Sequence, residues 1–330
     1  MARKFLVALA AGLGLFSGSV AAEAPLPPGN VVLVVTFPAG GPLDAVARIF
    51  ADKVSQRSDR SVVVENRPGA AGNVGAASVA RAAPNGLTWM MSVDSLWTTN
   101  PYLGVPPPFN LDQDITVVGQ LGQVVLMLAV KPAVPAKSWK ELLAYSKTKS
   151  LNFGSAGLGS PGHLALEYLK MQAPFDAVHV PFRGAAQVVQ ELLAGNIDGA
   201  FIVAGSMIEF MKDGKVRGLA ISDVKRHPLL PDVPTAEEAG VGEFKALFSN
   251  ILAVPAHTPV PIRTWLAREI KDVLAMADVR SRFDAIGTDI LATGEDETRA
   301  WIATERARWS KVIKARGLKV GGPPAKGPPN

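Results

Sequence analysis

Three glycine-rich segments contain the residues best suited to bind a ligand, at positions 37–44 (FPAGGPLD), 154–163 (GSAGLGSPGH) and 182–185 (FRGA). Each follows an apolar run and precedes a stretch with helical spacing of apolar residues, so each lies in a strand–loop–helix unit. Backbone N–H groups at a helix start, together with the helix dipole, bind an anion without a charged side chain. A tight turn explains any single loop, but one loop in each half of the chain favours a small anion held between two lobes.

The second loop also contains a G-x-G-x-x-G pattern, formed by Gly157, Gly159 and Gly162. After a strand and before a helix this pattern is typical of dinucleotide binding, and Arg183 could select the phosphate that distinguishes NADP. The acidic residue expected at the end of the following strand is missing. An NADP-dependent oxidoreductase is therefore kept only as the alternative function.

Hydrolytic and metal-dependent chemistry has weaker support. Leu158 occupies the place of the first glycine in a G-x-S-x-G nucleophile motif around Ser160. His163 lies only three residues further on and is expected to cap or pack locally. The chain has no Cys, and its four His residues lack metal-ligand spacing. These facts exclude thiolate zinc sites, iron–sulfur clusters and cysteine nucleophiles, and we expect no metal and no cofactor.

Short apolar strands alternate with amphipathic helices along the chain, which predicts an α/β fold with a largely parallel sheet. Strands are expected at residues 31–35, 62–64, 88–93, 124–130, 151–154, 178–182, 197–203, 216–222 and 252–255. Helices are expected at 43–56, 161–171, 185–194, 262–276 and 295–314, with others ending near 83 and starting at 138. A chain of 330 residues, 48% of them hydrophobic, has room for two domains.

Residues 1–22 have the pattern of a secretory signal peptide. Arg3 and Lys4 precede an apolar run at 5–16, and small residues at 17–22 suit cleavage after Ala22. The run is shorter than the ~20 residues that span a bilayer. We expect an exported, periplasmic protein, in a compartment where nicotinamide cofactors are scarce. Loss of the two basic residues lowers the net charge from +5 to +3, without the basic stripe that nucleic-acid binding needs.

The loops carry motifs that resemble those of a known family. In the first half these are F-P-A-G-G at 37–41 with Asp44 and Arg48, V-E-N-R-P-G-A-A-G at 64–72 and P-N-G at 84–86. In the second half they are N-F-G-S-A-G at 152–157, H-L-A at 163–165, H-V-P-F-R-G at 179–184 and P-D-V-P-T at 231–235. From about residue 30 to residue 316 the chain is similar to the Bug family, the periplasmic solute receptors of tripartite tricarboxylate transporters.

The resemblance implies a type II-like periplasmic binding fold with two lobes, each a mostly parallel sheet flanked by helices. Two crossovers near residues 124 and 250 would divide the chain into lobe 1 (25–124 and 250–316) and lobe 2 (125–249), with a flexible tail at 317–330. A small carboxylate would lie in the cleft, held by backbone amides and hydroxyls and often by ordered water. The resemblance further implies a receptor without a chemical step, with membrane permease subunits as partners, and we expect a monomer.

The family's ligand-binding positions correspond here to Ala39, Gly40, Asp44, Ser155, Ala156, Gly157 and Ser160. The candidate set is completed by Phe37, Ser95, Trp97, His163 and Arg183.

For several of these residues a structural role competes with ligand contact. Asp44 opens a helix, where a carboxylate caps or complements the dipole. Arg183 could pair with a ligand carboxylate or tether neighbouring loops. Trp97 could cover an apolar ligand body or pack in the core. Together with Ile202 and Val203, Trp97 favours an aromatic or other apolar acid over a small amino acid, and a dicarboxylic acid is the other class considered.

Overall fold

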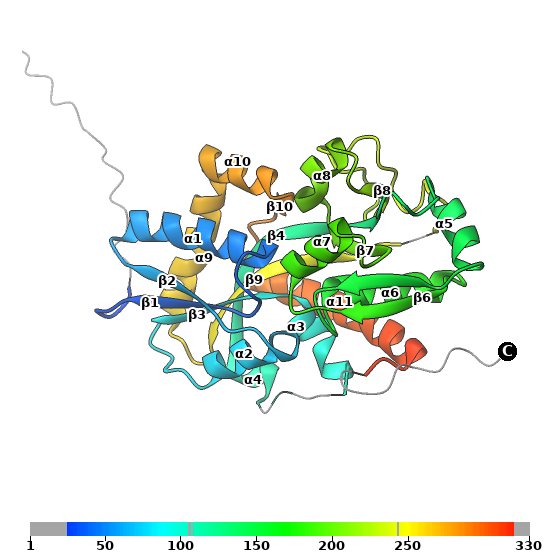
Figure 1. The fold of residues 1–330 in the computed structure, drawn as a ribbon. Coiled ribbons are helices and arrows are strands. Elements are labelled where there is room, and N and C mark those ends of the chain that lie inside the picture. Colours follow the sequence, from blue (N-terminus) through cyan, green and yellow to red (C-terminus); the bar gives the residue numbers. More distant parts are fainter. Residues whose placement is uncertain (1–24, 105–106, 108, 243, 320–330) are drawn as a thin grey trace, which may run out of the picture.

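A computed structural model describes residues 25–104, 107, 109–242 and 244–319, arranged as an α/β protein whose two halves lie side by side (Figure 1). The predicted signal peptide and residues 320–330 of the predicted tail lie outside these residues. In the part of the chain that is described, no helix is long and apolar enough to cross a membrane.

Three parallel strands form the outer part of the first sheet, in the order β2-β1-β3. They are β1 (Val31–Val35), β2 (Val62–Asn66) and β3 (Thr88–Val93). Four of the five β1 side chains are buried, as expected for a strand covered on both faces. The intervening helices are α1 (Pro42–Ser58), η1 (Ala70–Gly72) and α2 (Asn73–Ala80), and α3 (Ser95–Thr98), η2 (Asn100–Tyr102) and α4 (Leu111–Asp114) follow.

Two strands, β4 (Ile115–Val130) and β9 (Leu247–Pro255), connect the first sheet to the second. β4 pairs with β9 as far as Val125, and from Leu126 onward it pairs with strands of the second sheet. Ser222 joins the two connections, because its hydroxyl accepts the N–H of Leu126 at 2.9 Å and donates to the carbonyl of Ala246 at 2.8 Å. The two strand connections between the sheets therefore lie next to each other.

The second sheet has the parallel order β6-β5-β7, with β8 paired to β4. Its strands are β5 (Leu151–Ser155), β6 (Ala177–Pro181), β7 (Gly199–Val203) and β8 (Arg217–Ile221). Its helices are α5 (Trp139–Ser146), α6 (Pro161–Gln172), α7 (Ala185–Leu193), η3 (Ala204–Met207) and α8 (Ile208–Lys212). The expected parallel pairing is found in the outer strands of both halves, whereas β4 and β9 add antiparallel pairs because the chain runs out and back through them.

The C-terminal segment returns to the first half and then extends beneath the second (Figure 1). It comprises α9 (Val260–Ala275), α10 (Ala277–Ala285), β10 (Thr288–Ile290) and α11 (Glu295–Arg316). α11 contacts both α3 and α6, and its end is tied to α6 by an ion pair between Arg316 and Glu167 at 3.2 Å. This helix therefore spans the two halves.

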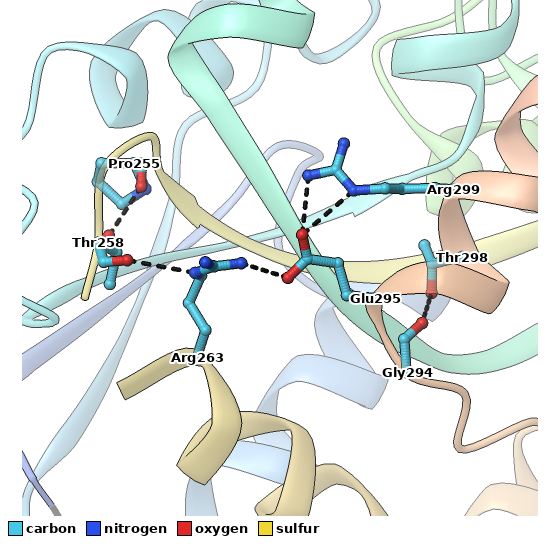
Figure 2. Close-up of polar contacts among 7 residues, drawn as sticks. All are labelled: Pro255, Thr258, Arg263, Gly294, Glu295, Thr298 and Arg299. Atoms are coloured by element: carbon cyan, nitrogen blue, oxygen red, sulfur yellow. Dashed lines mark hydrogen bonds and ion pairs between the residues drawn. The ribbon is translucent and has the colours of Figure 1, made fainter. Parts of the chain in front are cut away.

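A polar network fixes the start of α11 to the end of β9 (Figure 2). Glu295, in the first turn of α11, accepts hydrogen bonds from Arg299 at 2.9 and 3.2 Å and forms an ion pair with Arg263 of α9. Arg263 also donates to the carbonyl of Thr258, just after β9. A carboxylate at this place also complements the helix dipole, so the network anchors α11 where the second connection ends.

Candidate functional site

A cavity of about 180 Å³ lies where the loops of the two halves face each other. We call it the apolar cavity, because no described residue that lines it carries a charge. Its walls come from both halves and from both connecting strands, and they comprise Phe37–Leu43, Val93, Val124, Leu126, Ala156, Pro161, Gly162, Gly184, Ala185, Ala186, Val188, Val189, Phe201–Val203, Ser206 and Asn250.

A second cavity of about 450 Å³ adjoins the first and is called the Arg183 cavity. Phe37, Pro38 and Ala156 line both cavities. The remaining lining residues of the Arg183 cavity are Thr36, Pro68–Gly72, Gly157, Leu158, Ser160 and Pro181–Arg183.

Three helices begin at the apolar cavity: α1, α6 and α7. Their N-cap residues are Gly41, Ser160 and Gly184, and none of these makes a side-chain capping hydrogen bond. The N–H groups of a first helical turn have no partner within the helix. The starts of three helices therefore face the cavity, with the positive ends of their dipoles and with the N–H groups of their first turns that have no partner within the helix.

Two buried side chains at the cavities lack a hydrogen-bond partner among the described residues. One is the amide nitrogen Nδ2 of Asn250, which is 2% exposed and lines the apolar cavity. The other is the hydroxyl of Ser160, which is 1% exposed and lines the Arg183 cavity. A buried polar group without a partner costs roughly 1–3 kcal/mol, so both groups favour a ligand or water that accepts or donates there.

Asp44 organises the first loop. Its carboxylate accepts hydrogen bonds from the backbone N–H of Gly40 at 3.0 Å, from Arg48 at 2.9 Å and from the amide of Asn66 at 2.9 Å. Asn66 also donates to the carbonyl of Phe37. Burial raises the pKa of Asp44, but the hydrogen bonds from Arg48, Gly40 and Asn66 outweigh it and hold the pKa below its ordinary value. Both carboxylate oxygens are used inside the protein, which favours the capping interpretation.

Ser155 and two histidines organise the second loop. The Ser155 hydroxyl lies 2.6 Å from Nε2 of His179 and accepts the N–H of Gly157 at 3.2 Å. His163 stacks on His179 with ring centroids 4.1 Å apart, and its Nδ1 accepts the N–H of Gly159 at 3.0 Å. Burial lowers the pKa of His163 to about 4 and that of His179 to about 3. Both imidazoles are therefore neutral at pH 7, and His163 lines neither cavity.

The first loop and the second loop come together as expected. Phe37, Ala39 and Gly40 of the first loop and Ala156 of the second loop line the apolar cavity. Gly157, Ser160 and Arg183 line the adjoining cavity. The Arg183 side chain is exposed and forms no ion pair among the described residues, and its backbone N–H donates to Gln187.

Ser95 and Trp97 both lie in α3 and line neither cavity. Trp97 is 2% exposed and packs with Leu96, Ile115 and other buried residues of the first half. Its carbonyl accepts a hydrogen bond from Arg306 of α11 at 3.1 Å. The geometry supports the packing interpretation of Trp97, whereas Ile202 and Val203 do line the apolar cavity.

The glycines of the dinucleotide-like pattern have packing reasons for lacking a side chain. A Cβ on Gly159 would lie 2.9 Å from Leu103 and 3.2 Å from Ala71, both in the other half of the chain. A Cβ on Gly162 would lie 2.7 Å from the carbonyl oxygen of Phe201. The space beside Gly159 is thus occupied by protein where a dinucleotide site needs an approach for pyrophosphate.

Sequence reasoning overlooked Asn250. The available signal is the pair Ser249-Asn250, which interrupts the otherwise apolar strand LFSNILAVP. A polar pair inside a fully buried strand needs a partner or a ligand.

Among the described residues no group of three or more His, Asp or Glu side chains is placed to hold a metal ion.

Comparison with known proteins gives consistent results. Residues 46–318 match the model of the tripartite tricarboxylate transporter family receptor. Protein BugT of Bordetella pertussis is 30% identical over 321 residues, covering 94% of this chain and 98% of BugT. The periplasmic binding protein BugD is 28% identical with a TM-score of 0.83, covering 89% of this chain and 99% of BugD. R. palustris Rpa4515 with adipate is 28% identical with a TM-score of 0.84, covering 88% of this chain and 98% of Rpa4515. The chain belongs to the receptor family of tripartite tricarboxylate transporters, with the two-lobed fold of periplasmic binding proteins.

Proposed function

We propose that this protein is a periplasmic receptor that captures a small carboxylate between its two halves and delivers it to membrane permease subunits. The observation that carries the proposal is the convergence of three uncapped helix starts on one cavity that also contains the unpaired amide of Asn250. Such donors bind a carboxylate through hydrogen bonds and helix dipoles, without a charged side chain.

The proposed role is binding without chemistry. The described residues that line the apolar cavity include no acid, imidazole or thiol, and Ser206 is the only hydroxyl. General acid–base or nucleophilic catalysis needs such groups within reach of the substrate. A relative with adipate in its structure supports a carboxylate as the ligand.

We further propose that residues 25–124 with 250–316 and residues 125–249 are two lobes that move about the paired connections near Ser222, with the end of α11 held to α6 of the other lobe by the ion pair between Arg316 and Glu167. A monomer keeps both lobes free to close on the ligand, and the closed form is the state that the permease would recognise.

A ligand screen of the full chain, produced with its own leader and purified from the periplasmic fraction, tests these points. The panel contains aliphatic and aromatic acids, acidic amino acids, the matched amides, and nicotinamide nucleotides. A ligand at about 100 times its Kd adds about 2.7 kcal/mol to stability, so an acid should raise the melting temperature while its amide does not. A response to NADP alone would instead overturn the receptor proposal and favour the oxidoreductase alternative.

The variant Asn250→Leu makes the test specific for the site. Leucine has a similar volume but no donor, so the ligand-free protein should become more stable while affinity for the acid falls about tenfold or more. Asn152→Leu, at an exposed position of β5, is the matched control and should change neither quantity appreciably. Loss of affinity in both variants would argue against a role for Asn250 in binding.

A further inference from the structure

We infer that the ligand is a monocarboxylate whose body is a single ring or a branched hydrocarbon of similar size. The inference rests on the proposed receptor function and specifies its ligand class. Its first support is the character of the walls, where aliphatic and aromatic side chains from four elements enclose the cavity. Val93 of β3, Leu126 of β4, Val188 of α7 and Phe201 of β7 are each at most 7% exposed. Burying a hydrocarbon against such walls is favoured at roughly 25 cal/mol per Å².

The volume of the cavity limits the size of that body. A cavity of about 180 Å³ is slightly larger than the ~150 Å³ engineered cavity, lined by Leu, Ile and Phe, that binds benzene. One six-membered ring with a carboxylate at the helix starts therefore fits. A fused ring system or a long chain exceeds the volume of this cavity.

The charge distribution disfavours a second carboxylate. No described residue lining the apolar cavity is charged, and an ionised carboxylate buried without a partner is strongly unfavourable. Arg183 lines the adjoining cavity and does not line the apolar cavity. The first carboxylate can accept hydrogen bonds from the uncapped helix starts and from Asn250. A second carboxylate inside the cavity has no comparable set of donors left.

Titration calorimetry of the full protein tests the inference with benzoate and cyclohexanecarboxylate as ring monocarboxylates and adipate and malate as dicarboxylates. Benzamide is the uncharged control. We expect each ring monocarboxylate to bind at least tenfold more tightly than either dicarboxylate, and benzamide to give no measurable binding.

A cavity-filling variant locates the ring. Val189 of α7 is half-buried and lines the cavity, so Val189→Phe should fill the ring space and weaken benzoate binding at least tenfold. Val178→Phe is the matched control, because Val178 is 53% exposed and lines neither cavity. Circular dichroism and the melting temperature without ligand establish that each variant is folded. The comparison of monocarboxylates with dicarboxylates uses the unmodified protein, so it tests the inference even if a variant fails to fold.

The outcomes separate the inference from the function on which it rests. Adipate or malate binding as tightly as benzoate, with loss of binding in Asn250→Leu, would overturn the monocarboxylate inference and leave the receptor function intact. Equal benzoate binding by Val189→Phe and the unmodified protein would also overturn it. Absence of binding by every acid would overturn the receptor function itself.

Discussion

The carboxylate of Asp44 accepts the backbone N–H of Gly40 at 3.0 Å. This hydrogen bond, with those from Arg48 and Asn66, uses both oxygens of Asp44 and closes the first loop on the start of α1. Asp44, for which the sequence leaves both helix capping and ligand contact open, is therefore occupied in shaping the loop. The donors left for a ligand are backbone groups further along the helix start.

Replacing Asp44 with alanine should weaken both the fold and ligand binding. The variant leaves the N–H of Gly40 and the Asn66 amide without their acceptor, which should lower the free energy of unfolding by about 1–3 kcal/mol. Affinity for the ligand should fall about tenfold because the loop loses its preorganised shape. Chemical denaturation and calorimetry measure the two effects, with the exposed Asp52 on the same helix replaced by alanine as control. Lower affinity with unchanged stability would indicate direct ligand contact instead.

Local signals in the sequence predicted most strand–loop–helix units. The run 31–35 matches β1, and the Pro-Gly-Gly break followed by helical spacing matches α1 to within two residues. By contrast, only residues 124–130 of β4 were predicted, because Ile115–Gln123 contains polar residues and glycines. That part of the strand is stabilised by pairing with β9, which is more than 100 residues away in the chain. The short β10 was missed for the same reason, since it pairs with β4.

The candidate site was predicted in its loops but not in its walls. The strand–Gly–helix pattern is local, so the starts of α1, α6 and α7 could be recognised as donors. The hydrophobic residues that face the ligand depend on how the two halves meet, which a local pattern does not reveal. For this reason Trp97 was a candidate ligand-binding residue and Val93 was not. Trp97 packs with residues of the first half, whereas Val93 lines the apolar cavity.

Gly205 and Gly287 should not tolerate a side chain where the two halves meet. A Cβ on Gly205, after β7, would lie 2.3 Å from the Cα of Gly287, before β10. Gly205→Ala must therefore push the two backbones apart. It should lower the free energy of unfolding by roughly 1–3 kcal/mol, and the melting temperature with it. The control is Gly294→Ala, because a Cβ there meets no atom within 4 Å. Equal melting temperatures for Gly205→Ala and the control would show that this contact opens at no cost.

The stacked pair of His163 and His179 should make the protein less stable at acidic pH. Burial lowers the pKa of His163 to about 4 and that of His179 to about 3, below the ordinary value near 6.5. The unfolded chain then binds protons that the native state excludes, so stability is lost as the pH falls from about 6.5 through 4. For His163 this amounts to roughly 3 kcal/mol at about 1.4 kcal/mol per pKa unit.

Denaturation curves between pH 4 and 7.5 measure this dependence. His163→Asn keeps an acceptor for the N–H of Gly159, and His179→Gln keeps a polar group near Ser155. Each variant should lose less stability than the unmodified protein on acidification. Parallel curves for both variants and the unmodified protein would mean that the imidazoles have the same pKa in the native and unfolded states.

Asp94 should give the opposite pH dependence. It is fully buried beside α3, where its Oδ2 accepts the indole N–H of Trp301 at 2.9 Å. Burial, with a contribution from the charge of Glu305, raises its pKa to about 7. Because the native state holds this proton more tightly than the unfolded chain, its stabilising contribution is lost as the pH rises from about 4 through 7.

The variant Asp94→Asn cannot ionise and still offers an acceptor to Trp301. It should be more stable than the unmodified protein at pH 8, by roughly 2–4 kcal/mol, with the difference disappearing near pH 4. Denaturation at both pH values is the measurement. A constant difference at the two values would place the pKa of Asp94 at its ordinary value.

Arg183 should influence the rate of ligand capture more than the strength of binding. Its side chain is exposed at the adjoining cavity and has no ion pair among the described residues, so its field acts on an approaching anion. A charge at the rim of a site changes the association rate and its salt dependence, whereas groups that bury a ligand set the dissociation rate. Arg183→Gln should therefore slow association a few-fold at low salt and leave dissociation unchanged, as stopped-flow measurements at two ionic strengths would show. A faster dissociation rate in this variant would instead place the guanidinium in direct contact with the bound carboxylate.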